Sequence, residues 1–138
     1  MFDTVGDLNW LAVILATLAY YLLGALWYTP LFGHSWDTSI GFERPKGYRF
    51  PPIYYVAPLI SSFVATVATA VLVYALDIQL LVDAIVLALI VGIGYAASLS
   101  FTNAVTPNTP RPLMLGAVTG TYHLVGIIIA SAIIVSLR

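Results

Sequence analysis

The chain has 138 residues, of which 61% are hydrophobic and only 8% are charged, and its formal net charge is −1. A soluble domain carries about 25% charged residues, so this chain cannot cover an apolar core with a water-exposed surface. The surplus apolar side chains are expected to face lipid. The near-zero charge offers no basic surface for nucleic acid, and the absence of cysteine excludes disulfides and thiolate metal sites.

Four apolar stretches are long enough to cross the roughly 30 Å of hydrocarbon in a bilayer. They cover about residues 8–28, 53–76, 80–102 and 113–137. Because a backbone in lipid must satisfy its own hydrogen bonds, each stretch is expected to be a helix. The sequence therefore predicts an all-α, polytopic membrane protein with a single transmembrane domain over residues 1–138. Its four transmembrane helices are expected to form an antiparallel bundle, with both termini on the same side of the membrane.

Turn-forming residues mark the connections between these stretches. Pro30 and Gly33 are expected to end the first helix, and Pro51 and Pro52 to begin the second. The segment 31–50 is the only long connection, and its aromatic side chains predict that it lies in the headgroup zone of the membrane.

Basic residues predict the orientation of the chain in the membrane. Arg44, Lys46 and Arg49 lie between the first two stretches and Arg111 lies between the last two, whereas Arg138 is the one basic residue on the other side. This excess predicts that both of these connections are cytoplasmic. Both termini are then expected outside the cytoplasm, in a multi-pass protein of the inner (plasma) membrane.

His123 is the only ionisable side chain near the middle of a predicted span. Such residues are costly in lipid and usually face the interior of a helix bundle. With the predicted topology, Tyr20, Ser62 and Tyr95 fall near the same depth as His123. We therefore expect a polar layer in which a tyrosine hydroxyl bonds one imidazole nitrogen. A neutral, structural histidine and a proton relay are the two alternatives, and no metal site is predicted because no His, Asp and Glu set has ligand spacing.

Small residues recur at helical spacing and are expected to pack the helices together, because they let helix backbones approach closely in lipid. The packing positions are Gly24, Gly92, Ala96, Gly116 and Gly120. The alternative is that the same helix faces line a pore or a substrate path.

A further set of candidate residues lies where the predicted helices meet the headgroup zone. Trp27 and Tyr28 belong to an aromatic belt, which anchors helices at this boundary. Asn103 and Arg111 flank the connection between the last two predicted helices and are candidates for binding a lipid headgroup or a partner. A guanidinium such as that of Arg111 can clamp a phosphate or a carboxylate.

Several short motifs together resemble a known family. They are N-W-L-A-V at 9–13, L-G-A-L-W-Y-T-P-L-F-G at 23–33, R-P-L at 111–113 and Y-H-L at 122–124. The chain resembles a widespread prokaryotic family of small four-helix membrane proteins of unknown function. The resemblance implies the same fold and membrane location, and it supplies no activity. It directs attention to Trp27, Tyr28, Asn103, Arg111 and His123.

Signatures of enzymes are absent from the sequence: G-x-S-x-G, the P-loop and H-E-x-x-H do not occur. No catalytic residue and no cofactor is therefore predicted. We interpret the chain as a non-enzymatic protein surrounded by membrane lipids, forming a homo-oligomer or an accessory subunit of a larger membrane complex. One alternative is a small oligomeric transporter or channel with a polar path near His123 and Asn103. The other is a small enzyme acting on lipid, which needs a polar pocket near Arg111 and Tyr54. Four short helices are not expected to enclose a substantial cavity within one protomer.

Overall fold

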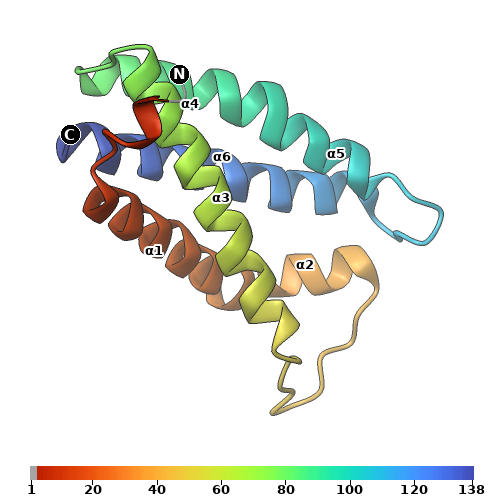
Figure 1. Ribbon diagram of the computed structural model, residues 1–138. Coiled ribbons are helices and arrows are strands. Elements are labelled where there is room, and N and C mark those ends of the chain that lie inside the picture. The colour runs from red at the N-terminus through yellow and green to blue at the C-terminus, as the bar shows by residue number, and fades with distance from the viewer. Residues whose placement is uncertain (1–2) are drawn as a thin grey trace.

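Four long helices make up most of the computed structural model, which describes residues 3–138 (Figure 1). The first span is α1 (Trp10–Leu26), which continues into a π-helical turn (Trp27–Leu31), and the second is α3 (Ile53–Ala75). The third span consists of α4 (Leu81–Val91), a π-helical turn (Gly92–Ala97) and α5 (Ser98–Ala104). The fourth span is α6 (Pro112–Ser136). A short 3₁₀ turn (Asp3–Val5) precedes α1, and a short helix, α2 (Gly33–Ile40), follows it.

The prediction of an all-helical protein with four apolar spans is confirmed. The spans contain 22 to 25 residues, and each is long and apolar enough to cross a membrane. At 1.5 Å per residue they reach about 33 to 38 Å, which exceeds the hydrocarbon thickness of a bilayer. No strand occurs within residues 3–138.

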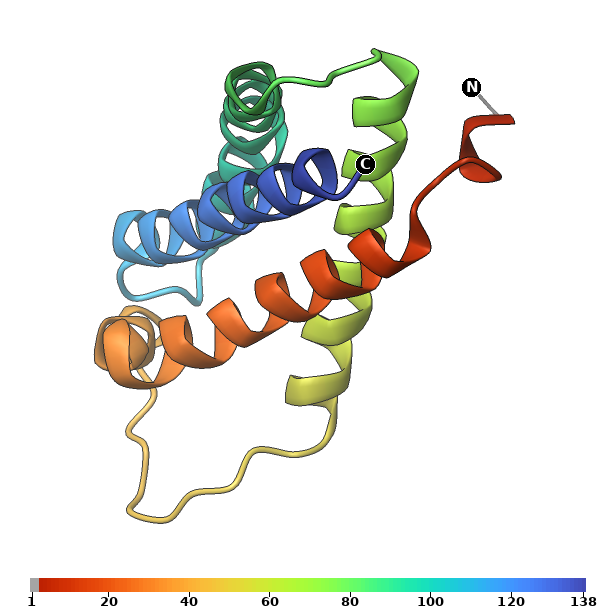
Figure 2. The ribbon, with the colours of Figure 1, turned by 90° about the vertical axis from the view of Figure 1, so that its left-hand side faces the viewer.

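Successive spans run in opposite directions, but α3 departs from a regular antiparallel bundle (Figure 1). Figure 2 shows α3 standing steeply across α1 and α6 instead of alongside them. We call the end of the spans at Asn9 and Leu137 the terminal end, and the end at Trp27, Ile53 and Pro112 the loop end. The steep crossing means that α3 packs closely at the terminal end and diverges from α1 toward the loop end.

The apolar core lies at the terminal end, where α1, α3 and α6 meet. Its buried members are Leu8, Val13, Ala16, Ala70, Val73, Ala130 and Ile134. Asn9 ties these helices together: its Oδ1 caps α1 by accepting from the N–H of Leu11 at 3.1 Å, and its Nδ2 donates to the Leu137 carbonyl at 2.6 Å. Its backbone N–H donates to the Tyr74 hydroxyl at 3.2 Å. The core alanines allow the close approach, and Asn9 fixes the register.

The first span ends at Leu31, between Pro30 and Gly33, as expected. Pro30 lies inside the π-helical turn over Trp27–Leu31. There the Phe32 N–H donates to the Trp27 carbonyl at 2.7 Å, a bond that spans five residues. A π-helical turn at a proline is a usual way for a helix to accommodate the missing N–H and the bulk of the ring.

The segment expected to be a long connection is partly helical. Gly33 is the first residue of α2, and a Cβ at this position would lie 2.7 Å from the Tyr28 carbonyl oxygen. α2 ends at Gly41, whose φ of 71° is in the left-handed region that glycine adopts without strain. Arg111 joins α2 to α6, because its backbone N–H donates to the Ser39 carbonyl at 3.1 Å.

The four glycines predicted to be packing positions all face another helix of the same protomer. A Cβ added to Gly24 would meet Tyr122, one on Gly92 would meet Leu124, one on Gly116 would meet Phe101, and one on Gly120 would meet Ala97. Ala96 is half-buried and packs against the cluster around Tyr20 and Tyr122. These small residues are therefore used for packing within one chain.

The turn between α3 and α4 is held to the end of α6 by Arg138. Its Nη2 lies 2.8 Å from Oδ1 of Asp77, and its Nη1 donates to the Ile78 carbonyl at 2.8 Å. Gln79 also donates to the Asp77 carboxylate, at 3.2 Å. The hydrogen bond from Gln79 and then the contact with Arg138 hold the pKa of Asp77 below its ordinary value of 3.8.

We expect Arg138→Ala to raise the pKa of Asp77, although the Gln79 bond keeps it from reaching the ordinary value. Because the pKa is lowered in the folded state, the ionised carboxylate stabilises the fold above the unfolded pKa, and this contribution is lost as the pH falls through the folded pKa. The carboxyl ¹³C shift of Asp77 followed by NMR against pH measures the change. Lys46→Ala, in the distant 41–52 connection, is the control, and an unchanged titration in Arg138→Ala would contradict the assignment.

Candidate functional site

A cavity of about 520 Å³ lies between α1, α2, α3 and α6 near the loop end. Its wall is formed by Tyr21, Gly24, Ala25, Tyr28 and Thr29 from the first span, Trp36 from α2, Arg44 and Phe50 from the following connection, Tyr54, Tyr55, Ala57, Pro58 and Ser61 from α3, and Tyr122 and His123 from α6. The expectation that one protomer holds no substantial cavity is therefore wrong. The cavity exists because α3 diverges from α1 in this half of the protein.

The cavity extends from the loop end to about the middle of the spans. Tyr54 and Tyr55 lie in the first turn of α3, which begins at Ile53. His123 lies eleven residues beyond Pro112, the first residue of α6, which corresponds to about 16 Å along the helix axis. Half of the hydrocarbon thickness is about 15 Å. The wall residues Ala25 and Ala57 are exposed, so the cavity is open between α1 and α3.

A connected set of aromatic rings forms much of the wall. The ring of Tyr28 lies 5.1 Å from that of Tyr122 and 6.0 Å from that of Trp36. The series continues from Trp36 to Phe50 at 6.5 Å and from Phe50 to Tyr54 at 5.0 Å. These separations are typical of favourable edge-to-face and tilted aromatic pairs. The rings therefore link α6, α2, the 41–52 connection and the start of α3 around one space.

The deep wall of the cavity is organised by Tyr20 and His123. The Tyr20 hydroxyl lies 2.7 Å from Nδ1 of His123, and Tyr20 itself is 1% exposed. In this hydrogen bond the tautomer of the imidazole decides which of the two atoms donates. In a neutral imidazole Nε2 then has the opposite role to Nδ1. Because His123 lines the cavity, its ring places one neutral polar group on the deep wall.

The close approach of α1 to α6 at Tyr20 depends on Gly126. A Cβ at Gly126 would overlap the Tyr20 ring, whose Cε2, Cδ2 and Cζ atoms occupy that position. The Tyr122 hydroxyl also reaches the Tyr20 carbonyl, at 3.5 Å. Sequence reasoning identified Gly116 and Gly120 on this helix and missed Gly126. Gly126 lies three residues after His123 and therefore on a neighbouring part of the same face of α6, which is the signal that could have identified it.

The structure brings together part of the expected polar layer. Tyr20 and His123 are in direct contact, and Ser62 is buried on α3 beside Tyr122. Tyr95 does not belong to the layer, because it is 68% exposed on the outside of the third span. It lies in the π-helical turn over Gly92–Ala97, whose wider winding rotates Tyr95 away from the face of the buried Gly92.

The candidates from the headgroup zone separate into two groups. Trp27 and Tyr28 are half-buried, and Nε1 of Trp27 donates to the Val118 carbonyl at 3.0 Å, so Trp27 joins the first span to α6. Asn103 and Arg111 are exposed and are not among the residues that line the cavity. A pocket was expected near Arg111 and Tyr54. The cavity in the structure is lined by Tyr54 but not by Arg111.

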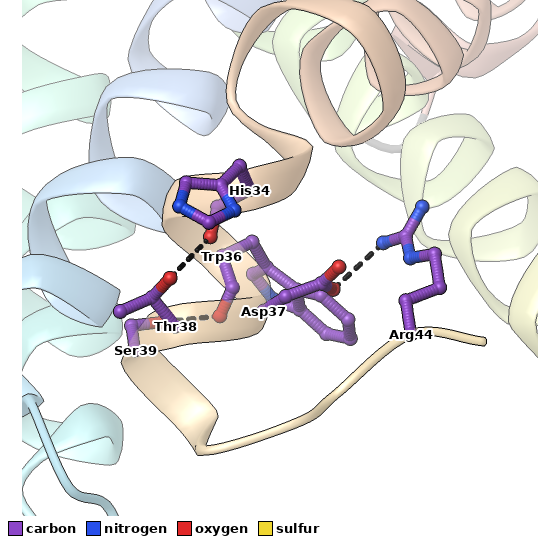
Figure 3. Close-up of polar contacts among 6 residues, drawn as sticks. All are labelled: His34, Trp36, Asp37, Thr38, Ser39 and Arg44. Carbon is purple, nitrogen blue, oxygen red and sulfur yellow. Dashed lines mark hydrogen bonds and ion pairs between the residues drawn. The ribbon is translucent and has the colours of Figure 1, made fainter. Parts of the chain in front are cut away.

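The basic side chain at the cavity is Arg44, which sequence reasoning used only to predict orientation. Its Nη2 lies 2.7 Å from Oδ1 of Asp37, which is buried on α2 (Figure 3). Its guanidinium carbon stands 4.9 Å from the centre of the Phe50 ring. Five of the eleven charged residues of the chain lie in the segment 31–50, and the acid and base seven residues apart there, Asp37 and Arg44, were the signal that could have indicated this site.

The arrangement suits a largely apolar molecule with a few polar contacts. Ligand sites of this kind combine an apolar and aromatic wall with a small number of placed polar groups. Here these groups are tyrosine hydroxyls, the imidazole of His123 and the guanidinium of Arg44. Within residues 3–138 no three His, Asp or Glu side chains lie close enough to hold a metal ion.

The fold and the site define an all-helical protein with four helices that could span a membrane and a cavity between three of them. The chain belongs to the family described as protein of unknown function (DUF1761), whose model matches residues 11–135. The matched residues include the whole cavity wall. No curated protein and no solved structure matches the chain. The resemblance to a four-helix membrane protein family of unknown function is thereby confirmed.

We expect Gly126→Ala to destabilise the protein by about 1–3 kcal/mol, because the added methyl group collides with a fully buried ring. Gly94→Ala is the matched control: Gly94 also lies in a span, but a Cβ there meets nothing within 4 Å. Alanine is a better helix former than glycine by about 1 kcal/mol, so Gly94→Ala should be neutral or stabilising. Unfolding by SDS in mixed micelles measures both variants. Equal effects at the two glycines would refute the predicted contact.

Proposed function

We propose that the protein is a non-enzymatic membrane protein that binds an amphipathic lipid, which enters from the surrounding bilayer into the cavity between α1 and α3. The observation that carries this proposal is the cavity itself, with a volume of about 520 Å³ and a wall of mostly aromatic and aliphatic side chains. A cavity of this size is within the range of small-molecule sites, about 300 to 1,000 Å³.

The depth of the cavity supports a lipid as the ligand. One end lies at Tyr54 and Arg44, where the spans leave the hydrocarbon, and the other lies at His123 near the middle of α6. A molecule that fills this space has one part at the membrane boundary and one part at the depth of acyl chains. This distribution is that of an amphipathic molecule aligned with the bilayer.

The exposure of the wall supports entry from the bilayer. Ala25, Ala57 and Ser61 are exposed where α1 and α3 diverge, and all three line the cavity. In a membrane this opening faces acyl chains, since both helices are apolar along this part. A lipid can therefore enter sideways, without crossing a polar barrier.

Two alternatives from the sequence receive less support than binding. A polar path past Asn103 would need that residue on the cavity, whereas it is exposed at the end of α5. Between His123 and the terminal end the spans are closed by the apolar cluster around Val13, Ala70 and Ala130. A lipid-acting enzyme would need an acid or a base placed for proton transfer. His123 is the imidazole on the cavity wall and its Nδ1 is bonded to the Tyr20 hydroxyl, but the lining residues include no carboxylate to act with it.

Self-association and membership of a larger complex stay predictions. They were motivated by the small residues at helical spacing. Those residues are already used within one chain, since Gly24, Gly92, Gly116 and Gly120 contact other helices of the same protomer. The lipid-binding proposal holds for a single protomer, because one chain supplies the whole cavity wall.

We expect Ala57→Trp to weaken lipid retention about tenfold, a change of about 1.4 kcal/mol, because the indole occupies the cavity. Ala68→Trp is the control, since Ala68 is also an exposed alanine on α3 but does not line the cavity. Native mass spectrometry of protein extracted in a mild detergent counts the lipid molecules retained per chain. Equal retention by both variants and the wild type would exclude the cavity as the binding site.

We also propose the orientation with both termini outside the cytoplasm, which rests on the basic residues of the 41–52 connection. The chain has no cysteine, so single cysteines can be introduced directly. In intact cells a membrane-impermeant maleimide should label Gln79→Cys, whereas Lys46→Cys should require permeabilised cells. Both positions are exposed, and the reverse labelling pattern would invert the proposed orientation.

A further inference from the structure

We propose that Arg44 binds the phosphate of the lipid headgroup and that the excess of positive charge in its connection selects lipids with a net negative charge. This inference rests on the proposed function, because it names the class of lipid that the cavity takes. Arg44 lies at the loop end of the cavity, where the headgroup of a lipid is expected, and its side chain lines the cavity wall.

The guanidinium of Arg44 is held in a fixed position from two sides. Asp37 contacts Nη2 at 2.7 Å, and its own side chain is only 12% exposed (Figure 3). The Phe50 ring lies beneath the guanidinium carbon at 4.9 Å, and Phe50 also lines the cavity. α2, which carries Asp37, is in turn fixed to α6 by the bond between Arg111 and Ser39. A charged group positioned in this way loses little conformational freedom when it binds a ligand.

Most of the hydrogen-bonding capacity of Arg44 is unused. A guanidinium has five N–H donors and no acceptor. Among the described residues, its side chain makes one hydrogen bond, to Asp37. Its Nε is buried and has no partner, which is unfavourable for a donor removed from water. The oxygens of a phosphate suit such a planar group, because they accept two parallel hydrogen bonds from it.

The neighbouring charges favour an anionic lipid over a zwitterionic one. Asp37 offsets the charge of Arg44, but Lys46 and Arg49 lie in the same connection, with Glu43 as its one acid. A quaternary ammonium in a headgroup held by Arg44 would thus meet a connection that carries three basic residues and one acid. Phosphatidylglycerol, whose headgroup has no cation, avoids this repulsion.

The test compares lipids retained from bilayers that contain equal amounts of phosphatidylglycerol and phosphatidylcholine. The protein is reconstituted, extracted in a mild detergent and analysed by mass spectrometry for the ratio of the two retained lipids. We expect the wild type to enrich phosphatidylglycerol about tenfold, which corresponds to about 1.4 kcal/mol of unfavourable interaction between the quaternary ammonium of phosphatidylcholine and the basic end of the cavity. Arg44→Gln should return the ratio of the two retained lipids to that of the bilayer.

Two further variants keep the test decisive. Arg49→Gln removes a charge from the same connection at an exposed residue that does not line the cavity, so it should retain most of the enrichment. The double variant Asp37→Asn, Arg44→Gln removes both members of the ion pair, so no buried carboxylate is left unpaired if Arg44→Gln alone fails to fold. It should fold and lack the enrichment.

Each outcome supports or overturns the role of Arg44. Enrichment that survives in the double variant, or that is lost equally in Arg49→Gln, would overturn it, as would a wild type without enrichment. Addition of inorganic phosphate identifies the source of the anion: if phosphate alone abolishes the enrichment, the site binds free phosphate and not a lipid. Failure of lipid binding itself is distinguishable, because retention would then be insensitive to Ala57→Trp.

Discussion

The contact between α1 and α6 at Tyr20 is the constraint on which the arrangement of the other helices depends. α6 is the most buried of the four spans, and Gly126 lets the Tyr20 ring lie against its backbone. The Tyr20 hydroxyl then satisfies Nδ1 of His123 at a depth where an unpaired polar group is costly. One aromatic side chain thus supplies packing and hydrogen bonding together. α3 lies across the α1 and α6 pair: its terminal half packs into the apolar core, and its loop half contributes Ser62, which is buried beside Tyr122.

The cavity follows from the way α3 completes the structure. Its terminal half places Ala70 and Val73 in the apolar core, whereas its loop half carries Pro58 and leans away from α1. Pro58 has no N–H to donate to the Tyr54 carbonyl, so the first turn of α3 lacks one of the bonds that a regular helix makes. The space is bounded on the other side by the rings of Tyr28 and Trp36, which hold their positions through contacts with each other.

Polar groups occupy two depths of this cavity, and they suggest how one molecule is recognised. Near the middle of the membrane, the hydrogen bond with Tyr20 holds His123 as a neutral polar group on the cavity wall. At the boundary, Asp37 and Phe50 fix Arg44 with most of its donors unused. An aromatic wall separates this cation from the neutral imidazole, which matches the order of polar and apolar parts in a lipid. Both polar groups are held by residues of other helices, so the site depends on the whole arrangement of the spans.

The sequence by itself determined the number of spans and their limits to within a few residues, because the low charge content leaves lipid as the only solvent for so apolar a surface. It also indicated that Tyr20 and His123 lie at one depth, since depth along a span follows from residue count. The direction in which a side chain points around the helix axis does not follow from residue count, and the π-helical turn places Tyr95 on the outside. The sequence also did not indicate α2, which forms where a long connection was expected. The tertiary structure alone decided the tilt of α3, the cavity and the position of Arg44. These depend on how side chains such as Tyr20 and Phe50 pack against distant residues, and no local pattern encodes those contacts.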